Sequence, residues 1–310
     1  MGLEPTPSGV TGRRYNQLNY DPQKNILSSV FIFFFNGRRN RTRTCDICAV
    51  PGDPTSLYWN PASAVSVSSQ TITTHYTGYF LDMQGGFAGW VSPSEDDAIG
   101  VSANYFYGGS FERTTMQDPL GTGEQFSSSS VAVAGTYARS LTPTINVGAT
   151  GKFVYSSIDE YSGNAFFVDA GATWRPSAGS PMTTALVVRN AGIQTKAFYR
   201  ENDPTPTEIA AGCSYSFAGP GVLVSAEVSY PVNGDPNAAL GVEYAPMDML
   251  TLRLGGNLRD MDSSKEAGGG FVDGMAFGMG TSFNRLALDY CFKPFADLGS
   301  VHRISLGYTL

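Results

Sequence analysis

The residue types that could carry metal, redox or nucleophilic chemistry do not stand at the spacings that such chemistry needs. Cys45 and Cys48 form a CxxC pair, but a zinc site needs two further ligands. The only histidines, His75 and His302, lie near opposite ends of the strand-rich part of the chain. No serine stands in the GxSxG turn of a hydrolase. We therefore expect no cofactor, no metal and no enzyme; a membrane hydrolase in which the two histidines meet is a remote alternative.

The elements that would position these side chains read as β-strands. From Gln70 onward, short segments alternate apolar and polar residues, and the charges keep to one phase of the alternation. In 249–259, for example, Leu250, Leu252 and Leu254 share a phase and Arg253 falls in the other. Successive side chains of a strand point to opposite faces, so the phase without charge must meet an environment that rejects charge. That environment is either a soluble core or the lipid around a closed barrel.

Alternation and turn signals together predict about fourteen strands. They fall at 69–76, 83–92, 97–107, 126–140, 144–158, 164–175, 184–191, 206–218, 221–230, 236–245, 249–259, 271–281, 285–292 and 301–310. Short turns, among them one at 162–164, alternate with three longer connections at 108–125, 194–205 and 260–270. This contrast is typical of outer-membrane barrels.

Charged residues within the strands all fall in the phase that would face the lumen of such a barrel. They are Lys152, Asp169, Glu227, Glu243, Arg253, Asp289 and Arg303. Lysine or arginine on the lipid face costs roughly 2–4 kcal/mol at the bilayer midplane, which accounts for the clean separation. In a soluble sandwich, the alternative fold, the charged phase would be the solvent face.

Aromatic residues near the strand ends favour the membrane barrel. Such girdles mark the two membrane interfaces; the candidates are Tyr105, Tyr107, Tyr155, Trp174, Tyr230, Tyr244 and Tyr308. The 36 glycines and the 15% of charged residues also suit a sheet with many turns. We predict an all-β transmembrane antiparallel barrel in the bacterial outer membrane, with outer-membrane lipid as its surroundings. A soluble β-sandwich or structural protein is the alternative.

The first 49 residues do not follow the strand pattern. Residues 1–50 carry seven Lys/Arg and three Asp/Glu, a balance of +4, which leaves −11 for the remainder of a chain whose net charge is −7. The acidic main part argues against nucleic acid as a partner. A six-residue apolar stretch, 30–35, precedes an arginine cluster, which is the reverse of the order in a signal peptide. We expect residues 1–49 to be foreign to the fold, through a mis-called start or a frameshift that replaced the native signal peptide, and the barrel to occupy 50–310.

A motif at 52–62, GDPTSLYWNPA, precedes the first strand. By residue type it is a packed turn in which Asn60-Pro61 redirects the chain. The string closely resembles the N-terminal signature of the PorV/PorQ family, relatives of the FadL-like outer-membrane proteins. The closing segment 302–308, HRISLGY, is similar to that family's last strand.

The resemblance implies a barrel of about fourteen strands with an N-terminal hatch folded into the lumen. By that analogy Asp53, Asn60 and Pro61 shape the hatch, while Leu57, Tyr58, Trp59 and Ala62 complete its motif and pack it against the inner wall. It also implies either of two functions: transport of hydrophobic small molecules, or assistance to protein secretion of type IX with secretion-machinery proteins as partners.

Overall fold

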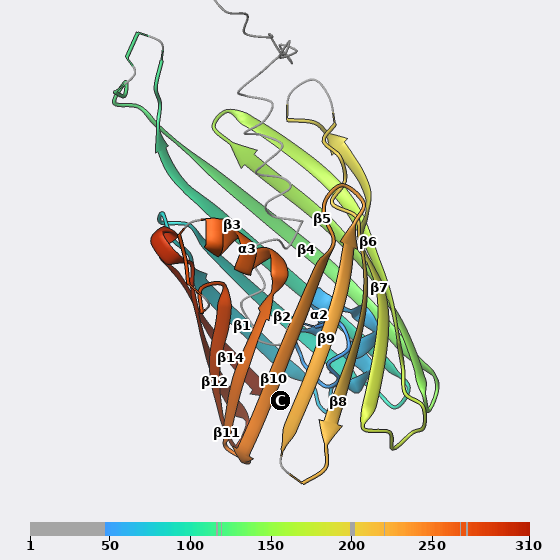
Figure 1. Ribbon diagram of the computed structural model, residues 1–310. Coiled ribbons are helices and arrows are strands. Elements are labelled where there is room, and N and C mark those ends of the chain that lie inside the picture. Colours follow the sequence, from blue (N-terminus) through green and yellow to red (C-terminus); the bar gives the residue numbers. More distant parts are fainter. Residues whose placement is uncertain are drawn as a thin grey trace, which may run out of the picture.

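The structure, a computed structural model, describes residues 47–310 except 116, 119, 199–201, 220, 267 and 271. Its strands close into one antiparallel barrel in which each strand pairs with its neighbours in sequence (Figure 1). The strands are β1 (Thr71–Gly78), β2 (Gln84–Pro93), β3 (Asp97–Glu112), β4 (Gln125–Thr142), β5 (Ile145–Ile158), β6 (Tyr161–Trp174), β7 (Met182–Lys196), β8 (Glu208–Phe217), β9 (Val222–Pro231), β10 (Asn237–Met247), β11 (Leu250–Asn257), β12 (Met275–Phe283), β13 (Leu286–Pro294) and β14 (Ser300–Thr309). The predicted fold, a closed barrel of fourteen strands, is confirmed.

The first and last strands close the barrel. β1 pairs with β14 from Thr71 opposite Thr309 to Gly78 opposite His302, and it pairs with β2 on its other edge. Closure leaves no exposed sheet edge, which is the condition for a sheet to span a bilayer.

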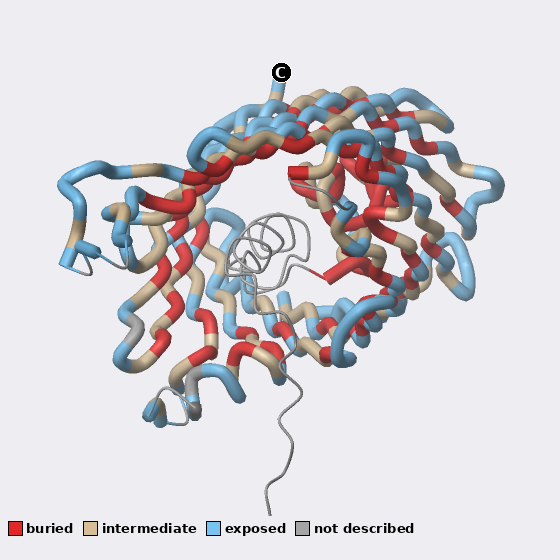
Figure 2. Tube along the Cα trace, turned by 90° about the horizontal axis from the view of Figure 1, so that it is seen from above, coloured by how far each residue is buried: buried red, intermediate tan, exposed pale blue. Residues whose placement is uncertain are grey.

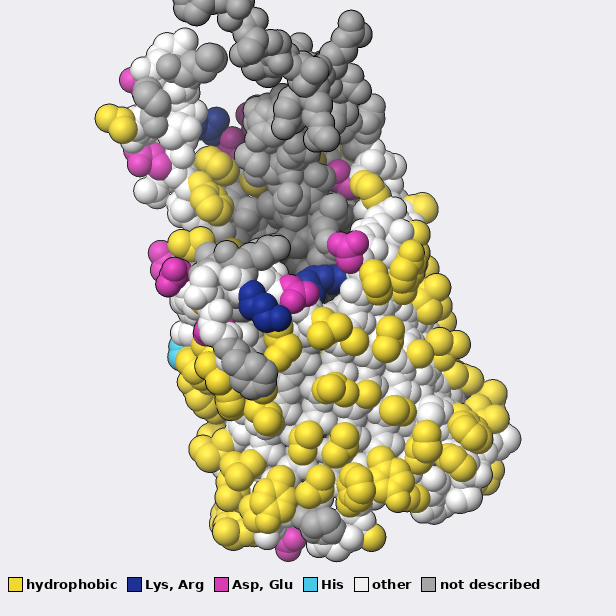
Figure 3. All heavy atoms as spheres, viewed as in Figure 1, with side chains coloured by type: hydrophobic (Ala, Val, Ile, Leu, Met, Phe, Trp, Pro, Cys, Tyr) yellow, Lys and Arg dark blue, Asp and Glu magenta, His cyan; other side chains and the backbone are white. Residues whose placement is uncertain are grey.

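The outer face of the wall carries the apolar phase of each strand. Leu252 and Leu254 of β11 are each 41% exposed, although both are large and apolar, while Arg253 between them turns inward. Hydrophobic side chains cover most of the wall that is visible in Figure 3, and most of the visible charged side chains lie toward one end of it. An aqueous surround would penalise so much exposed apolar surface, so the natural solvent of this face is lipid.

Connections differ at the two ends of the barrel. One end holds short links such as 94–96, 143–144 and 284–285, and the other holds the longer ones at 113–124, 197–207 and 258–274. Exposed aromatic side chains lie toward both ends of the wall. Trp174, Tyr244 and Tyr308 are near the short-link end, and Tyr155 and Tyr230 are near the long-link end.

Two of the connections predicted from sequence are wrong in detail. Residues 162–164 belong to β6, and the β5–β6 turn lies instead at Asp159 and Glu160, where Asp159 adopts a positive φ of 53°. Aspartate tolerates that conformation because its short polar side chain can bond locally. The 260–270 connection holds a helix, α3 (Leu258–Glu266), which begins directly after β11. A short helix η2 (Ala296–Leu298) joins β13 to β14.

A segment before β1 lies inside the barrel. It contains α2 (Ser56–Trp59) and η1 (Pro61–Ser66), and η1 contacts the inner face of β4, β5 and β6. Seen from above, its buried residues lie within the ring of strands (Figure 2). We call residues 47–70 the hatch. Within the part of the chain that the structure describes, the helices are all too short or too polar to cross a bilayer.

Apolar side chains join the hatch to the wall. Leu57, Ala64 and Val67 of the hatch form one buried cluster with Phe87, Val91, Ala98 and Ala138 of β2, β3 and β4. Ile47, Cys48 and Ala49 form a second one with Ala185, Val187 and Ala210 of β7 and β8. The hatch therefore packs against two separate stretches of the wall.

The segment expected to be foreign to the fold lies mostly outside the described residues. Residues 1–46, with Cys45 and the arginine cluster, are among those not described. Ile47, Cys48 and Ala49, which were assigned to that segment, are packed within the barrel.

Candidate functional site: the hatch and the inner wall

The hatch motif folds around the side chain of Asn60. Its amide nitrogen donates to the Cys48 carbonyl over 2.8 Å, and its oxygen accepts from the backbone N–H of Ala62 over 3.0 Å. This second bond caps η1, which Pro61 begins, a position that suits proline because its missing N–H would have no partner there. Asn60 is fully buried. One amide therefore holds two limbs of the hatch together: residues 47–50, the N-terminal limb, and η1.

Asp53 orders the start of α2. Its carboxylate accepts from the N–H of Thr55 over 2.9 Å, and its carbonyl accepts from the N–H of Ser56 over 3.0 Å. Tyr58 and Trp59 follow, with their rings in an edge-to-face contact at 4.6 Å between centroids. The Tyr58 ring also lies edge-on to Phe87 of β2, 6.5 Å away. These contacts direct the aromatic surface of the motif toward the wall.

Two glycines of the wall make room for η1. A Cβ at Gly148 of β5 would stand 2.6 Å from the carbonyl carbon of Pro61, and a Cβ at Gly171 of β6 would stand 2.0 Å from Oδ1 of Asn60. The two glycines face each other in the β5–β6 register. We call this pair the glycine shelf. No side chain larger than hydrogen fits there while the hatch is in place.

A buried ion cluster holds the other side of the hatch. Arg189 of β7 donates to Glu208 of β8 at 2.8 Å and to both carboxylate oxygens of Glu227 of β9 at 3.2 and 3.4 Å. Its Nε donates to the Trp59 carbonyl over 2.8 Å, and Glu227 accepts the N–H of Cys48 over 2.8 Å. All three charged side chains are at least nine-tenths buried. Such a cluster is stable only when nearly every donor and acceptor is used, and hatch backbone groups supply part of that set.

A β-bulge in β7 brings a second ion cluster beside the first. Val168 faces Ala191 and Ala170 faces Val188, so Asp169 stands opposite two residues, Arg189 and Asn190. Asn190 takes a φ of 55°, and both Arg189 and Asn190 turn inward. Bulges redirect side chains in this way and are frequent near functional sites.

The second cluster consists of Lys152, Asp169 and Asn190. Lys152 forms an ion pair with Asp169 and donates to the Asn190 side chain at 3.0 Å. Asp169 accepts the backbone N–H of Asn190 at 2.7 Å, which fixes the bulge. The Lys152 ammonium lies 5.7 Å from the centre of the Tyr58 ring, a cation–π distance. The hatch therefore touches this cluster as well.

A third ion cluster lies on β10, β11 and β13, and the hatch contacts described above do not involve it. Arg253 of β11 bonds Glu243 of β10 at 2.9 Å and pairs with Asp289 of β13. Their side chains are 13–21% exposed, which is more than those of the Arg189 cluster. Arg303 of β14 is buried and donates to Thr77 of β1 at 3.0 Å. Nearby, burial raises the pKa of Tyr79, in the β1–β2 connection, against the opposing effect of the Arg303 charge.

All seven charges predicted for the lumen turn to the inner side of the wall in the structure. They form separate groups around Lys152, Arg189, Arg253 and Arg303. Sequence reasoning missed Arg189, Glu208, Asn190 and Lys293. Lys293 is buried in an ion pair with Asp260 of α3. A break in the alternation at Arg189-Asn190, where two adjacent polar residues interrupt an apolar strand, was the available signal for the bulge.

The two histidines lie on opposite faces of the β1–β14 pair. The His75 ring stacks on Phe87 at 5.1 Å between centroids, on the hatch side. The exposed His302 ring bonds Tyr290 Oη at 2.8 Å and Ser300 Oγ at 2.9 Å. The structure therefore does not bring them together as an acid–base pair. No group of three or more potential metal ligands occurs among the residues that the structure describes.

The inner wall of β3 to β6 toward the long-link end carries an apolar cluster, beside the buried hydroxyls of Ser128, Ser130 and Ser156. Seven buried residues form one cluster there: Phe106, Ala132, Val154, Ile158, Ala165, Phe167 and Phe198. Tyr79, Met83, Phe126 and Tyr161 pack around it. The lumen of a polar-solute porin is lined by polar groups, so this surface favours a different kind of solute.

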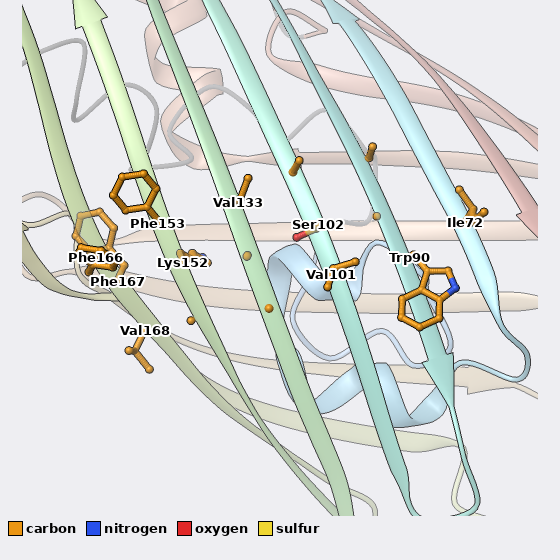
Figure 4. Close-up of a pocket in the computed structure, with 16 residues that line it drawn as sticks. Ile72, Trp90, Val101, Ser102, Val133, Lys152, Phe153, Phe166, Phe167 and Val168 are labelled. Atoms are coloured by element: carbon orange, nitrogen blue, oxygen red, sulfur yellow. The ribbon is translucent and has the colours of Figure 1, made fainter.

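An apolar hollow also lies on the outer face of the same wall (Figure 4), with the hatch helices behind the strands. It has a volume of about 1180 Å³. Trp90, Val101, Val133, Phe153 and Phe166 are among its lining residues, and small residues such as Gly135 and Gly151 leave it open. Its chemistry matches the acyl chains that would surround the barrel.

Comparison with solved structures finds similar folds in three transport or FadL-type proteins. The Pseudomonas putida toluene transporter TodX is similar at a TM-score of 0.60 and 11% identity, over 84% of this chain and 94% of that one. The CymD monoaromatic hydrocarbon channel is similar at 0.58 and 11%, over 85% and 94%. A Pseudomonas aeruginosa FadL homologue is similar at 0.53 and 12%, over 91% and 98%.

The class that fold and hatch define is a closed β-barrel with an internal N-terminal segment, similar in fold to these proteins. At these identities the likeness establishes the fold alone. No family model matches the chain, and no curated protein matches it. These three similar structures are named as transport or FadL-type proteins, and none of the three carries the PorV/PorQ name.

Proposed function

We propose that the chain is a bacterial outer-membrane channel for hydrophobic small molecules, in which the hatch closes the lumen. The apolar inner-wall cluster around Phe106, Phe167 and Phe198 carries this proposal. A hydrophobic solute needs buried apolar contact along its route, and this cluster supplies it on the inner side of a barrel whose outer side is also apolar. The similarity to TodX and CymD, named for toluene and monoaromatic hydrocarbons, supports the choice of solute.

The hatch accounts for the closed state of such a channel. A barrel of fourteen strands is wide enough to admit small polar solutes if nothing fills it. Leu57, Trp59 and Asn60 are buried between the hatch and the wall, so the hatch fills part of the lumen by close packing. The role in protein export that the 52–62 motif also implies rests on that resemblance and on the closing strand alone.

Uptake by intact cells tests the proposal. Cells with a lipopolysaccharide outer membrane, which hydrocarbons cross slowly, would express the barrel or an empty vector and receive labelled toluene or a labelled disaccharide. We expect the barrel to accelerate toluene uptake and to leave disaccharide uptake unchanged. Phe167→Gln, which places an amide in the apolar cluster, should reduce the gain at an equal amount of assembled barrel. Acceleration of the disaccharide alone would refute the proposal.

A further inference from the structure

The two limbs of the hatch are attached to the wall by different chemistry. η1 rests on the glycine shelf and packs against β4, β5 and β6. The N-terminal limb instead lies on β7, β8 and β9. There the backbone N–H of Cys48 donates to the Glu227 carboxylate, and the Ala49 carbonyl accepts from the Ser214 hydroxyl over 2.8 Å. Both attachments include close packing, because Ile47, Cys48 and Ala49 also pack on Ala185, Val187 and Ala210 and a Cβ at Gly212 of β8 would stand 2.9 Å from Cys48 Sγ. The N-terminal limb is in addition bonded to a charged cluster.

The cluster of Arg189, Glu208 and Glu227 can remain paired when the N-terminal limb leaves the wall. Arg189, Glu208 and Glu227 come from three adjacent strands and bond one another directly. If the limb leaves, they keep these mutual bonds and the bond from Arg189 to the Trp59 carbonyl, and water can replace the Cys48 N–H. Water reduces the cost of the exposed charge, because the penalty for a buried charge is one of desolvation. Water cannot replace apolar packing, and the packing around η1, which places Leu57, Ala64 and Val67 against Phe87 and Val91, involves larger wall side chains than the packing of the N-terminal limb on Ala185, Val187 and Ala210. Displacement of η1 therefore costs more than displacement of the N-terminal limb.

We propose that Arg189 is the positioning residue that latches the hatch, and that the hatch opens by release of the N-terminal limb from β7–β9 while η1 stays on the glycine shelf. Arg189 reaches both parts of the latch: it holds Trp59 through Nε, and it neutralises Glu227, which holds Cys48. Asn60 joins the two limbs through its bond to Cys48 and is the pivot. This mechanism rests on the proposed function only in taking the hatch as the gate.

Site-specific thiol labelling tests the latch without any measurement of transport. Cys48 is 1% exposed and Ala64, on η1, is fully buried, so each position reports on one limb. In a background with Cys45, Cys213 and Cys291 changed to serine, native Cys48 reports on the N-terminal limb. Adding Cys48→Ser and Ala64→Cys makes η1 the reporter. A small water-soluble maleimide would be applied to the full-length protein in outer membranes, and assembly would be checked by heat-modifiable gel mobility.

In the Arg189→Gln variant we expect labelling at position 48 to accelerate about tenfold or more, the shift that follows from loss of one hydrogen bond to a charged group. Labelling at position 64 should stay at the wild-type rate. The matched control is Arg253→Gln, which removes an arginine from the lumen cluster of β10, β11 and β13 and should leave both rates unchanged. Acceleration at both positions would mean that the hatch leaves as a whole, and acceleration at neither would mean that Arg189 is no latch. Either result overturns the mechanism.

A second variant tests the mechanism if Arg189→Gln does not assemble into a barrel. Ser214→Ala removes only the hydroxyl that holds the Ala49 carbonyl, and it introduces no charge change. It should accelerate labelling at position 48 by a smaller factor and leave position 64 protected. Equal protection at both positions would contradict the mechanism. Because no cargo is involved, a negative toluene uptake result and a negative labelling result remain distinguishable.

Discussion

Asn60 lies so close over Gly171 that a Cβ added at residue 171 would stand 2.0 Å from its Oδ1. The same oxygen accepts the N–H that begins η1, and the same amide binds the N-terminal limb. The contact between the Asn60 side chain and Gly171 of β6 therefore limits how closely the hatch can approach the wall. The wall and the hatch motif are complementary at this point in shape as well as in polarity.

Gly171→Ala should therefore lift the hatch. Relief of the overlap requires η1 or the wall to move, at a cost of about 1–3 kcal/mol for overpacking. We expect faster thiol labelling of a cysteine placed at Ala64 of η1, and normal barrel assembly. Gly135→Ala and Gly151→Ala are matched controls, because a Cβ at either would meet nothing within 4 Å. If Gly171→Ala behaves like these controls, the hatch does not occupy the glycine shelf.

Leu252→Arg should impair assembly into lipid far more than Thr251→Arg. Leu252 is exposed on the outer wall beside Tyr244 and Met279, whereas Thr251 belongs to the inward phase. A charge facing lipid costs roughly 2–4 kcal/mol if position 252 lies near the midplane. Urea titration of folding into phospholipid vesicles would measure the difference. Equal effects at both positions would contradict the membrane orientation of β11.

Asn190→Val should disturb β7 more than Asn190→Gly. A β-branched residue is strained at a φ of 55°, whereas glycine adopts it freely. Both variants lose the bond to Lys152, so the difference between them isolates the bulge. We expect Asn190→Val to lower the unfolding temperature of the assembled barrel by the equivalent of about 1–3 kcal/mol relative to Asn190→Gly. Equal unfolding temperatures would show that the backbone conformation at Asn190 is not required.

His75→Ala and His302→Ala, singly or together, should leave function intact. The two rings lie on opposite faces of the β1–β14 pair, so they cannot act on one substrate atom. Small stability losses are expected from the stacking of His75 on Phe87 and from the bonds of His302 to Tyr290 and Ser300. Esterase and protease assays of the purified protein provide the check. A turnover that either substitution abolishes would establish an enzyme instead.

The strands were predictable because lipid on one side imposes a two-residue period that survives in the sequence. Leu252 and Arg253 show it directly, and the hatch motif was recognisable as a string at 52–62. The Arg189 cluster was not predictable in the same way. The bulge at Asn190 changes the phase in the middle of β7, so Arg189 and Asn190 both turn inward although they are adjacent. Its partners, Glu208 and Glu227, lie beside it because of the pairing register of β7, β8 and β9. The alternation of residues within each strand does not predict that register.

Local turn chemistry misled the sequence analysis at two places for a related reason. Ser162-Gly163-Asn164 reads as a turn, yet the hairpin with β5 around residues 159–160 includes all three residues in β6, and Asn164 also pairs with Lys196 of β7. The polar stretch after Asn257 reads as a loop, yet it forms α3, whose Asp260 is held by the inward-facing Lys293 of β13. In both cases pairing or contact with other parts of the wall outweighs the preference of the residues themselves.

Single-channel recording in planar bilayers tests the central claim, closure of the lumen by the hatch, most directly. Trp59 is 7% exposed, contacts Tyr58, and lies with its ring 5.8 Å from the Arg189 guanidinium. Trp59→Ala should remove about 3–5 kcal/mol of packing from the hatch and leave the barrel standing. Trp174→Ala, at an exposed outer-wall tryptophan, is the control. We predict that the wild type and Trp174→Ala stay largely closed to ions while Trp59→Ala conducts. A steady wild-type conductance equal to that of Trp59→Ala would contradict closure by the hatch.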